Sequence, residues 1–234
     1  MNPNMEFDIL EFAEGAKRAS GLAVIIDVFR AFSVACYAAE GGASGIIATA
    51  SVEEAFNLKR KYKNSVLVGE RNERKIDGFD YGNSPTEILK ADIKGKIVIH
   101  TTTAGTTGLV NAVNADQILA GSFVNASSTA EYIKRINPQV VSFVAMGYRA
   151  NESAAEDLLC AEYIISLLLD DKKQFSERIS GLRYSSGERF FNPVNIEFSP
   201  PTDFFLCTMP NRFSFVLKAF RRHDGNMELE RIDI

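Results

Sequence analysis

The stretch KIVIHTTTAGTTGLVNAV, residues 96–113, decides how the chain folds. Its apolar beginning, through Ile99, predicts a buried strand, and residues 106–113 predict a helix. Small hydroxyl residues and a glycine lie between the two. A strand, a short polar loop and a helix in this order form the repeating unit of an α/β fold.

The same unit recurs along the chain. Strands are predicted over residues 22–27, 45–48, 65–70, 97–100, 117–120 and 140–146. Helices are predicted over residues 31–40, 51–63, 106–113, from 125 or 127 to 136, and 156–169, with a short one opened by the Ser84-Pro85 pair. Residues 1–21 suggest an irregular or edge element with a short helix over 11–18. Apolar strands that alternate with helices predict an α/β fold with a doubly wound, mostly parallel sheet and helices on both faces.

The tail of the chain has a different character. From about residue 181 it is rich in Phe, Pro, Ser and Asn. Residues 204–207 and 213–217 suggest strands, and the polar run at 223–226 is typical of a hairpin turn. We therefore expect an α/β core over residues 1–180 and a strand-rich C-terminal extension over 181–234 that packs on the core within a single domain.

Composition excludes several classes of protein. The 234 residues are 46% hydrophobic, which is enough for a large core, and the net charge of −4 lacks the basic footprint of a nucleic-acid partner. No apolar run reaches the ~20 residues of a membrane span, and the first eight residues lack the pattern of a secretory signal. The three cysteines show no metal-binding spacing, so buried, reduced thiols are expected. These features predict a cytoplasmic protein without a membrane partner; the oligomeric state stays open, a homodimer being one option.

The threonine-rich loop at 101–107 has two interpretations. Backbone N–H groups at a helix start, threonine hydroxyls and a close approach at Gly105 are typical of an anion site. The same residues suit a turn in which threonines cap the helix. The local sequence leaves both open.

Polar residues cluster at the carboxyl ends of the predicted strands, where open α/β sheets bind ligands. They are Asp27, Arg30, Glu70, Arg71, Thr101, Thr102, Thr103, Ser122, Asn125, Glu156 and Asp157. Five such sets at successive strand ends predict a functional cleft at this edge of the sheet.

The chemistry of these residues suggests phosphoryl transfer. The carboxylates suit Mg²⁺, and the arginines, Arg149 among them, suit phosphate oxygens. Each residue also has a structural alternative: Asp27 could cap the next helix, and Glu70 with Arg71 could be a solvated pair. Glu156 and Asp157 are adjacent and about 100° apart on a helix, so one cleft cannot use both equally. His100 is expected to be a structural histidine.

Five segments together carry a family resemblance. They cover residues 24–31, 69–71 with 75–85, 101–106, 121–126 and 156–161. The most specific are the strings GFDYGNSP, residues 78–85, and TTTAGT, residues 101–106. In this order they resemble the 2-phosphosulfolactate phosphatases of coenzyme M biosynthesis.

The resemblance implies a Mg²⁺-dependent hydrolase that converts (R)-2-phospho-3-sulfolactate to 3-sulfolactate and phosphate. On this hypothesis Asp27 holds Mg²⁺ with Glu70 or the Glu156-Asp157 pair, and Arg30 or Arg71 neutralises the phosphoryl oxygens. The expected contacts to the acid groups are Asn83, Ser84, Thr101, Thr102, Thr103, Gly105, Thr106, Ser122 and Asn125. Two alternatives remain: a phosphatase for another small phosphorylated hydroxy acid, and a non-catalytic binder of small organic anions.

Overall fold

The computed structural model describes residues 4–171 and 174–234, so the first three residues of the predicted 1–21 segment lie outside it. The strands are β1 (Glu6–Glu11), β2 (Leu22–Ile26), β3 (Gly45–Ala48), β4 (Ser65–Arg71), β5 (Arg74–Lys75), β6 (Ile97–Thr101), β7 (Gln117–Gly121), β8 (Val140–Ala145), β9 (Phe215–Arg221) and β10 (Met227–Asp233). The α-helices are α1 (Phe12–Arg18), α2 (Ala31–Glu40), α3 (Val52–Lys61), α4 (Pro85–Ile88), α5 (Gly105–Asn111), α6 (Ala126–Ile136), α7 (Ala155–Leu168), α8 (Ser176–Gly181) and α9 (Pro201–Cys207). The 3₁₀ turns are η1 (Phe123–Asn125), η2 (Leu182–Tyr184), η3 (Glu188–Phe191) and η4 (Pro193–Asn195).

One sheet joins the strands in the order β1-β8-β2-β7-β9-β10-β3-β6-β4-β5. It contains two parallel blocks, one formed by β1, β8, β2 and β7 and the other by β3, β6 and β4. The antiparallel hairpin β9–β10 lies between the blocks and pairs with both. The prediction of an α/β fold with a mostly parallel sheet is confirmed.

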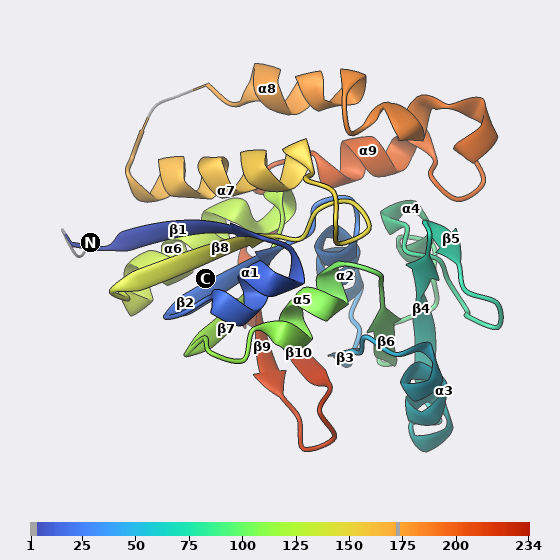
Figure 1. Ribbon diagram of the computed structural model, residues 1–234. Helices are drawn as coiled ribbons and strands as arrows, with labels where there is room; N and C mark the ends of the chain where they lie inside the picture. The colour runs from blue at the N-terminus through green and yellow to red at the C-terminus, as the bar shows by residue number, and fades with distance from the viewer. Residues whose placement is uncertain (1–3, 172–173) are drawn as a thin grey trace.

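Three apolar layers hold this sheet. Successive residues of a strand point to opposite faces, so Ala23 and Ile25 of β2 join one layer while Val24 and Ile26 join another. The first layer surrounds α2 and α5 and takes side chains from both blocks. The second lies between the first block and helices α6 to α9, and the third lies between the second block and α3 (Figure 1). Helices therefore cover both faces, as predicted.

The twist of the sheet brings the two blocks' carboxyl ends together. The blocks run in opposite directions, because β7, β9, β10 and β3 alternate in direction. Neighbouring strands rotate by about 20–25° each, so the six steps from β2 to β4 rotate the strands by roughly 120–150°. In Figure 1 the two blocks are steeply inclined to each other, and the ends of β2 and β4 approach the same central region. A flat sheet would have placed these ends at opposite edges.

The C-terminal tail differs from its prediction in two respects. The predicted strand at 204–207 is wrong, because these residues belong to helix α9. Pro201 at the first helical position and Asp203 in the first turn are helix-start signals that outweigh the β-propensity of the phenylalanines. The predicted hairpin is confirmed, with Gly225 at a φ of 85° in its turn, but it lies inside the sheet rather than packed on the core.

Two compositional expectations can be compared with the fold. All three cysteines are buried and unbonded. Within residues 4–171 and 174–234, no helix combines the length and the apolar character that crossing a bilayer requires.

Candidate active site

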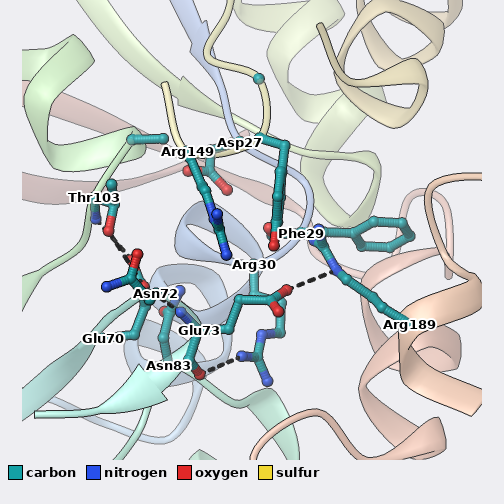
Figure 2. Close-up of a pocket in the computed structure, with 13 residues that line it drawn as sticks. Asp27, Phe29, Arg30, Glu70, Asn72, Glu73, Asn83, Thr103, Arg149 and Arg189 are labelled. Carbon is teal, nitrogen blue, oxygen red and sulfur yellow. Dashed lines mark hydrogen bonds and ion pairs between the residues drawn. The ribbon is translucent and has the colours of Figure 1, made fainter. Parts of the chain in front are cut away.

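A small cavity of about 40 Å³, partly open to solvent, lies where β2 and β4 end (Figure 2). The side chains and loops around it carry both charges. The lining residues are Asp27, Phe29, Arg30, Glu70, Asn72, Glu73, Asn83, Thr103, Ala104, Gly147, Tyr148, Arg149 and Arg189.

Asp27 is the carboxylate at the end of β2. Only 6% of it is exposed, and its Oδ1 accepts a hydrogen bond of 3.0 Å from the N–H of Ala31 at the start of α2. Gly105 packs directly against it: a Cβ there would lie 2.8 Å from Asp27 Oδ2. Burial, together with the charges of Glu70 and Glu156, raises the pKa of Asp27 to about 7. Both of its protonation states are therefore accessible near neutral pH.

Glu70, from β4, holds the threonine loop in place. Its Oε1 accepts a hydrogen bond of 2.7 Å from the N–H of Thr103, and its Oε2 accepts one of 2.8 Å from the N–H of Glu73. Thr102 and Thr106 bond to each other, each N–H donating to the other's hydroxyl. The loop N–H groups expected to be free for an anion are thus occupied by protein acceptors. Of the loop, only Thr103 and Ala104 line the cavity.

Ser122 and Asn125 follow β7 but do not line this cavity. The N–H of Ser122 donates to Asn125 Oδ1, and Asn125 Nδ2 donates to the carbonyl of Ala120. The Ser122 hydroxyl lies 2.7 Å from that of Ser33 in α2. Their polar groups fasten the end of β7 to α2, so their predicted contact with the substrate has no support in the cavity geometry.

Of the two predicted catalytic arginines, Arg30 and Arg71, one lines the cavity and the other does not. Arg30 lines the cavity and is 4% exposed; its Nη1 lies 2.7 Å from Asp203 Oδ2, in a buried ion pair with α9. Arg71 lies outside the lining, and its Nη2 donates to the carbonyl of Ala50 and to the hydroxyl of Thr101. The structure thus places Arg30 at the cavity and uses Arg71 and Thr101 to join loops.

Asn83 reaches the cavity with help from His100. The His100 Nε2 lies 3.1 Å from Asn83 Oδ1. Burial lowers the pKa of His100 to about 4, so the ring is neutral at neutral pH and donates from Nε2 to the amide oxygen. This bond fixes the Asn83 side chain while leaving its Nδ2 group for a ligand. Ser84 instead caps α4 and donates to Asp203 Oδ1.

Glu156 and Asp157 have separate tasks, as their angular spacing suggests. Asp157 accepts hydrogen bonds from the N–H of Val28 and the N–H of Gly147, so it joins the ends of β2 and β8; burial raises its pKa. Glu156 is 2% exposed, and its Oε2 finds no hydrogen-bond partner in the part of the chain that the structure describes. In the described parts of the chain, no group of three or more His, Cys, Asp or Glu side chains is close enough together to hold a metal. Glu156 does not line the cavity, but its charge acts on Asp27, which does.

Three cavity features escaped prediction: Glu73, Arg189 and the partner of Arg30, Asp203. Arg189 Nε lies 3.0 Å from Glu73 Oε1, and its side chain is 18% exposed. Both Arg189 and Asp203 come from the tail that the sequence assigned to strands. The proline pair before Asp203 is the one local signal that could have revealed its helix; none marks Arg189. Arg149, predicted as a phosphate partner, lines the cavity and is exposed.

Comparison with known proteins agrees with these motifs. The profile of the 2-phosphosulpholactate phosphatase family matches residues 9–183. A protein of Carboxydothermus hydrogenoformans named probable 2-phosphosulfolactate phosphatase is 41% identical over 170 residues, 72% of this chain and 70% of the relative. One of Bacillus subtilis with the same name is 35% identical over 218 residues, 90% of this chain and 92% of the relative.

Proposed function

The chain belongs to the 2-phosphosulpholactate phosphatase family, and from this premise we propose that it hydrolyses (R)-2-phospho-3-sulfolactate to 3-sulfolactate and phosphate. It is a phosphoric monoester hydrolase. The observation that carries the proposal is the buried carboxylate of Asp27, which faces a cavity that three arginines also line.

This arrangement suits phosphoryl transfer. Positioning and charge neutralisation provide most of the catalysis of that reaction. Arg30 is fixed by Asp203, and Arg149 makes no ion pair within the described residues, so both can meet phosphoryl oxygens. Asn83 adds a neutral donor whose orientation His100 fixes.

We propose Mg²⁺ as the cofactor, held by Asp27 and Glu156. Mg²⁺ is usually bound by one or two carboxylates, with waters and substrate oxygens completing its coordination. A divalent cation would offset the repulsion that Glu70 and Glu156 exert on Asp27, and it would give the Oε2 of Glu156 a partner that the described residues do not supply. When bound, the ion supplies charge neutralisation for the phosphoryl group.

Asp27 has two roles open to it. Its carboxylate can accept a proton from an attacking water, or it can attack phosphorus directly. The second route breaks the P–O bond to 3-sulfolactate, which leaves as the alcohol after protonation, and forms an aspartyl phosphate that water then hydrolyses. Trapping of a phosphorylated Asp27 in a quenched reaction separates these routes.

The function is tested by phosphate release from 2-phospho-3-sulfolactate in Mg²⁺. Asp27→Asn should lower kcat by at least about 100-fold, in line with the loss of a general base or nucleophile. Asp92→Asn, at an exposed side chain paired with Lys96, is the matched control and should retain wild-type kcat. Wild-type kcat in Asp27→Asn would remove Asp27 from the mechanism.

A substrate panel separates the two alternatives. Equal kcat/KM for phospholactate would favour a broader hydroxy-acid phosphatase. Binding of 3-sulfolactate without phosphate release from any substrate would indicate a non-catalytic binder. We further propose that the enzyme acts in the cytoplasm, in coenzyme M biosynthesis, as a homodimer and without a nucleic-acid partner.

A further inference from the structure

Arg189 lies between the cavity and a neighbouring groove and lines both. The cavity contains Asp27, and Tyr148 also lines the groove. It comes from η3, after residue 183, where the family profile ends. The arginine therefore lies beyond the segment that the family profile matches, although the alignment with the Bacillus subtilis relative extends past it.

The ion pair of Arg189 and Glu73 crosses the mouth of the cavity. Glu73 lies in the turn between β4 and β5, and Arg189 faces it from the C-terminal segment (Figure 2). The arginine Nε is 3.0 Å from Glu73 Oε1, but its N–H bond is not directed at an acceptor, so this contact is an ion pair without a hydrogen bond. The remaining contacts fix the position of the guanidinium: Nη2 donates to the carbonyl of Phe29 at 3.2 Å, and the group stacks over the ring of Tyr148.

The other cavity arginines are less suited to a second anion. Arg30 is hydrogen-bonded to Asp203 and to the carbonyl of Phe198, both at 2.7 Å. Arg149 is exposed and is assigned above to the phosphoryl group. Arg189 is partly buried, pre-positioned, and held by a carboxylate that an incoming oxyanion can replace.

The groove beside Arg189 offers neutral donors. Its lining includes the side chains of Ser153, Ser185, Ser186, Asn192 and Asn195, and one carboxylate, Glu188. Two of these donors are already used, because Asn195 Nδ2 donates to the carbonyl of Arg189 and the Ser185 hydroxyl donates to that of Leu182. The Ser186 hydroxyl is buried and meets no hydrogen-bond partner among the described residues, so it is a donor that a ligand can use. A guanidinium beside hydroxyl and amide groups is the chemistry that binds a carboxylate or a sulfonate.

We propose that Arg189 binds the oxyanion of the substrate remote from its phosphate, sulfonate or carboxylate, by exchanging Glu73 for it. This inference rests on the proposed phosphatase function, and it assigns specificity to a residue outside the family motifs. Glu73 then acts as a placeholder that neutralises Arg189 in the free enzyme and is released when the substrate binds.

Steady-state kinetics of Arg189→Ala test the proposal on three substrates. Loss of a charge-assisted hydrogen bond should raise KM for 2-phospho-3-sulfolactate by about 10- to 100-fold with a smaller change in kcat. Phospholactate, which lacks the sulfonate, identifies the group: an unchanged KM assigns Arg189 to the sulfonate, and an equal increase assigns it to the carboxylate. Glycerol 2-phosphate, which lacks both, should be hydrolysed equally by wild type and variant.

Two further variants sharpen the test. Glu73→Gln removes the placeholder and should lower KM for 2-phospho-3-sulfolactate by about 3- to 10-fold, and Arg189→Ala in the same chain should abolish that gain. Arg178→Ala is the matched control, because this exposed arginine pairs with Glu162 and lines neither the cavity nor the groove. Its KM should equal that of wild type.

Binding of the product gives a readout independent of turnover. 3-Sulfolactate should raise the Tm of wild type and of Arg178→Ala, but not that of Arg189→Ala. If Arg189→Ala had the same KM as wild type and the same Tm increase with 3-sulfolactate, the inference about Arg189 would be overturned. Phosphate release by the wild type would still support the phosphatase function.

Discussion

The buried ion pair between Arg30 and Asp203 should be among the most costly contacts to break. The side chains are 4% and 0% exposed, and Nη1 lies 2.7 Å from Oδ2. The other oxygen of Asp203 accepts hydrogen bonds from the Ser84 hydroxyl at 2.8 Å and the N–H of Thr86 at 3.0 Å. One carboxylate therefore connects α9 to α4 and to the cavity arginine.

Asp203→Ala leaves the Arg30 charge buried without its counter-ion. Removal of one partner of a buried pair costs about 3–5 kcal/mol. For a chain of this length, each kcal/mol lowers Tm by about 2–4 °C, so the expected decrease is roughly 6–20 °C. Arg30 keeps the carbonyl of Phe198 as an acceptor, which favours the lower half of this range.

An exposed pair provides the matched control. Arg178 and Glu162 are 2.6 Å apart but 51% and 46% exposed, so Glu162→Ala should cost less than about 1 kcal/mol. Thermal and urea unfolding of both variants, followed by circular dichroism, measure the difference. Equal losses in Asp203→Ala and Glu162→Ala would refute the reasoning.

A double-mutant cycle isolates the pair from its surroundings. Arg30→Met with Asp203→Ala leaves neither charge buried, so its loss should be smaller than the sum of the two single losses by about 2 kcal/mol or more. Strict additivity would show that the two charges do not stabilise each other. The double variant should still lack activity, because Arg30 lines the cavity.

Three further predictions follow from other contacts. Burial lowers the pKa of His100 from 6.5 to about 4, so below pH 6.5 the unfolded chain binds a proton that the folded chain does not, and stability falls as the pH falls toward 4. Tm should therefore decrease less between pH 6.5 and 5 in His100→Gln than in wild type; parallel decreases would contradict this. Glu156→Gln should raise Tm in EDTA and abolish the Tm increase caused by Mg²⁺, whereas an undiminished Mg²⁺ response would exclude Glu156 as a ligand. Gly105→Ala places a Cβ 2.7 Å from that of Ala31 and should cost about 1–3 kcal/mol, unlike Gly45→Ala, which meets nothing within 4 Å; equal Tm values would count against the close packing.

Local sequence patterns predicted where the strands and helices lie along the chain better than they predicted the order of the strands in the sheet. Continuous apolar runs identified β2 and β3, whose residues are almost all buried, and helical spacing and a capping box identified α2 and α3. Insertion of the β9–β10 hairpin between β7 and β3 depends on pairing between distant segments. No local residue pattern encodes such a pairing.

The sequence likewise predicted part of the candidate site and missed the rest. Asp27, Arg30, Glu70, Asn83 and Thr103 were predicted from strand ends and family motifs, and all line one cavity. Ser122, Asn125 and Arg71 occupy equivalent positions in the sequence, yet Ser122 and Asn125 bond to each other and to the end of β7, and Arg71 bonds to the carbonyl of Ala50. A polar residue after a strand can serve a loop or a ligand, and three-dimensional neighbours decide which.

The segment after residue 183 completes the site in two ways. Asp203 fixes Arg30 from one side, and Arg189 closes the mouth of the cavity against Glu73 from the other. The carboxylates assigned to phosphoryl chemistry, Asp27 and Glu156, come from the α/β core instead. Substitutions at Arg189 can therefore change which acid group the enzyme accepts without altering the groups assigned to phosphate removal, whereas substitutions at Asp203 affect Arg30. Relatives that share the core motifs but differ at the position of Arg189 should accordingly share the reaction and differ in substrate.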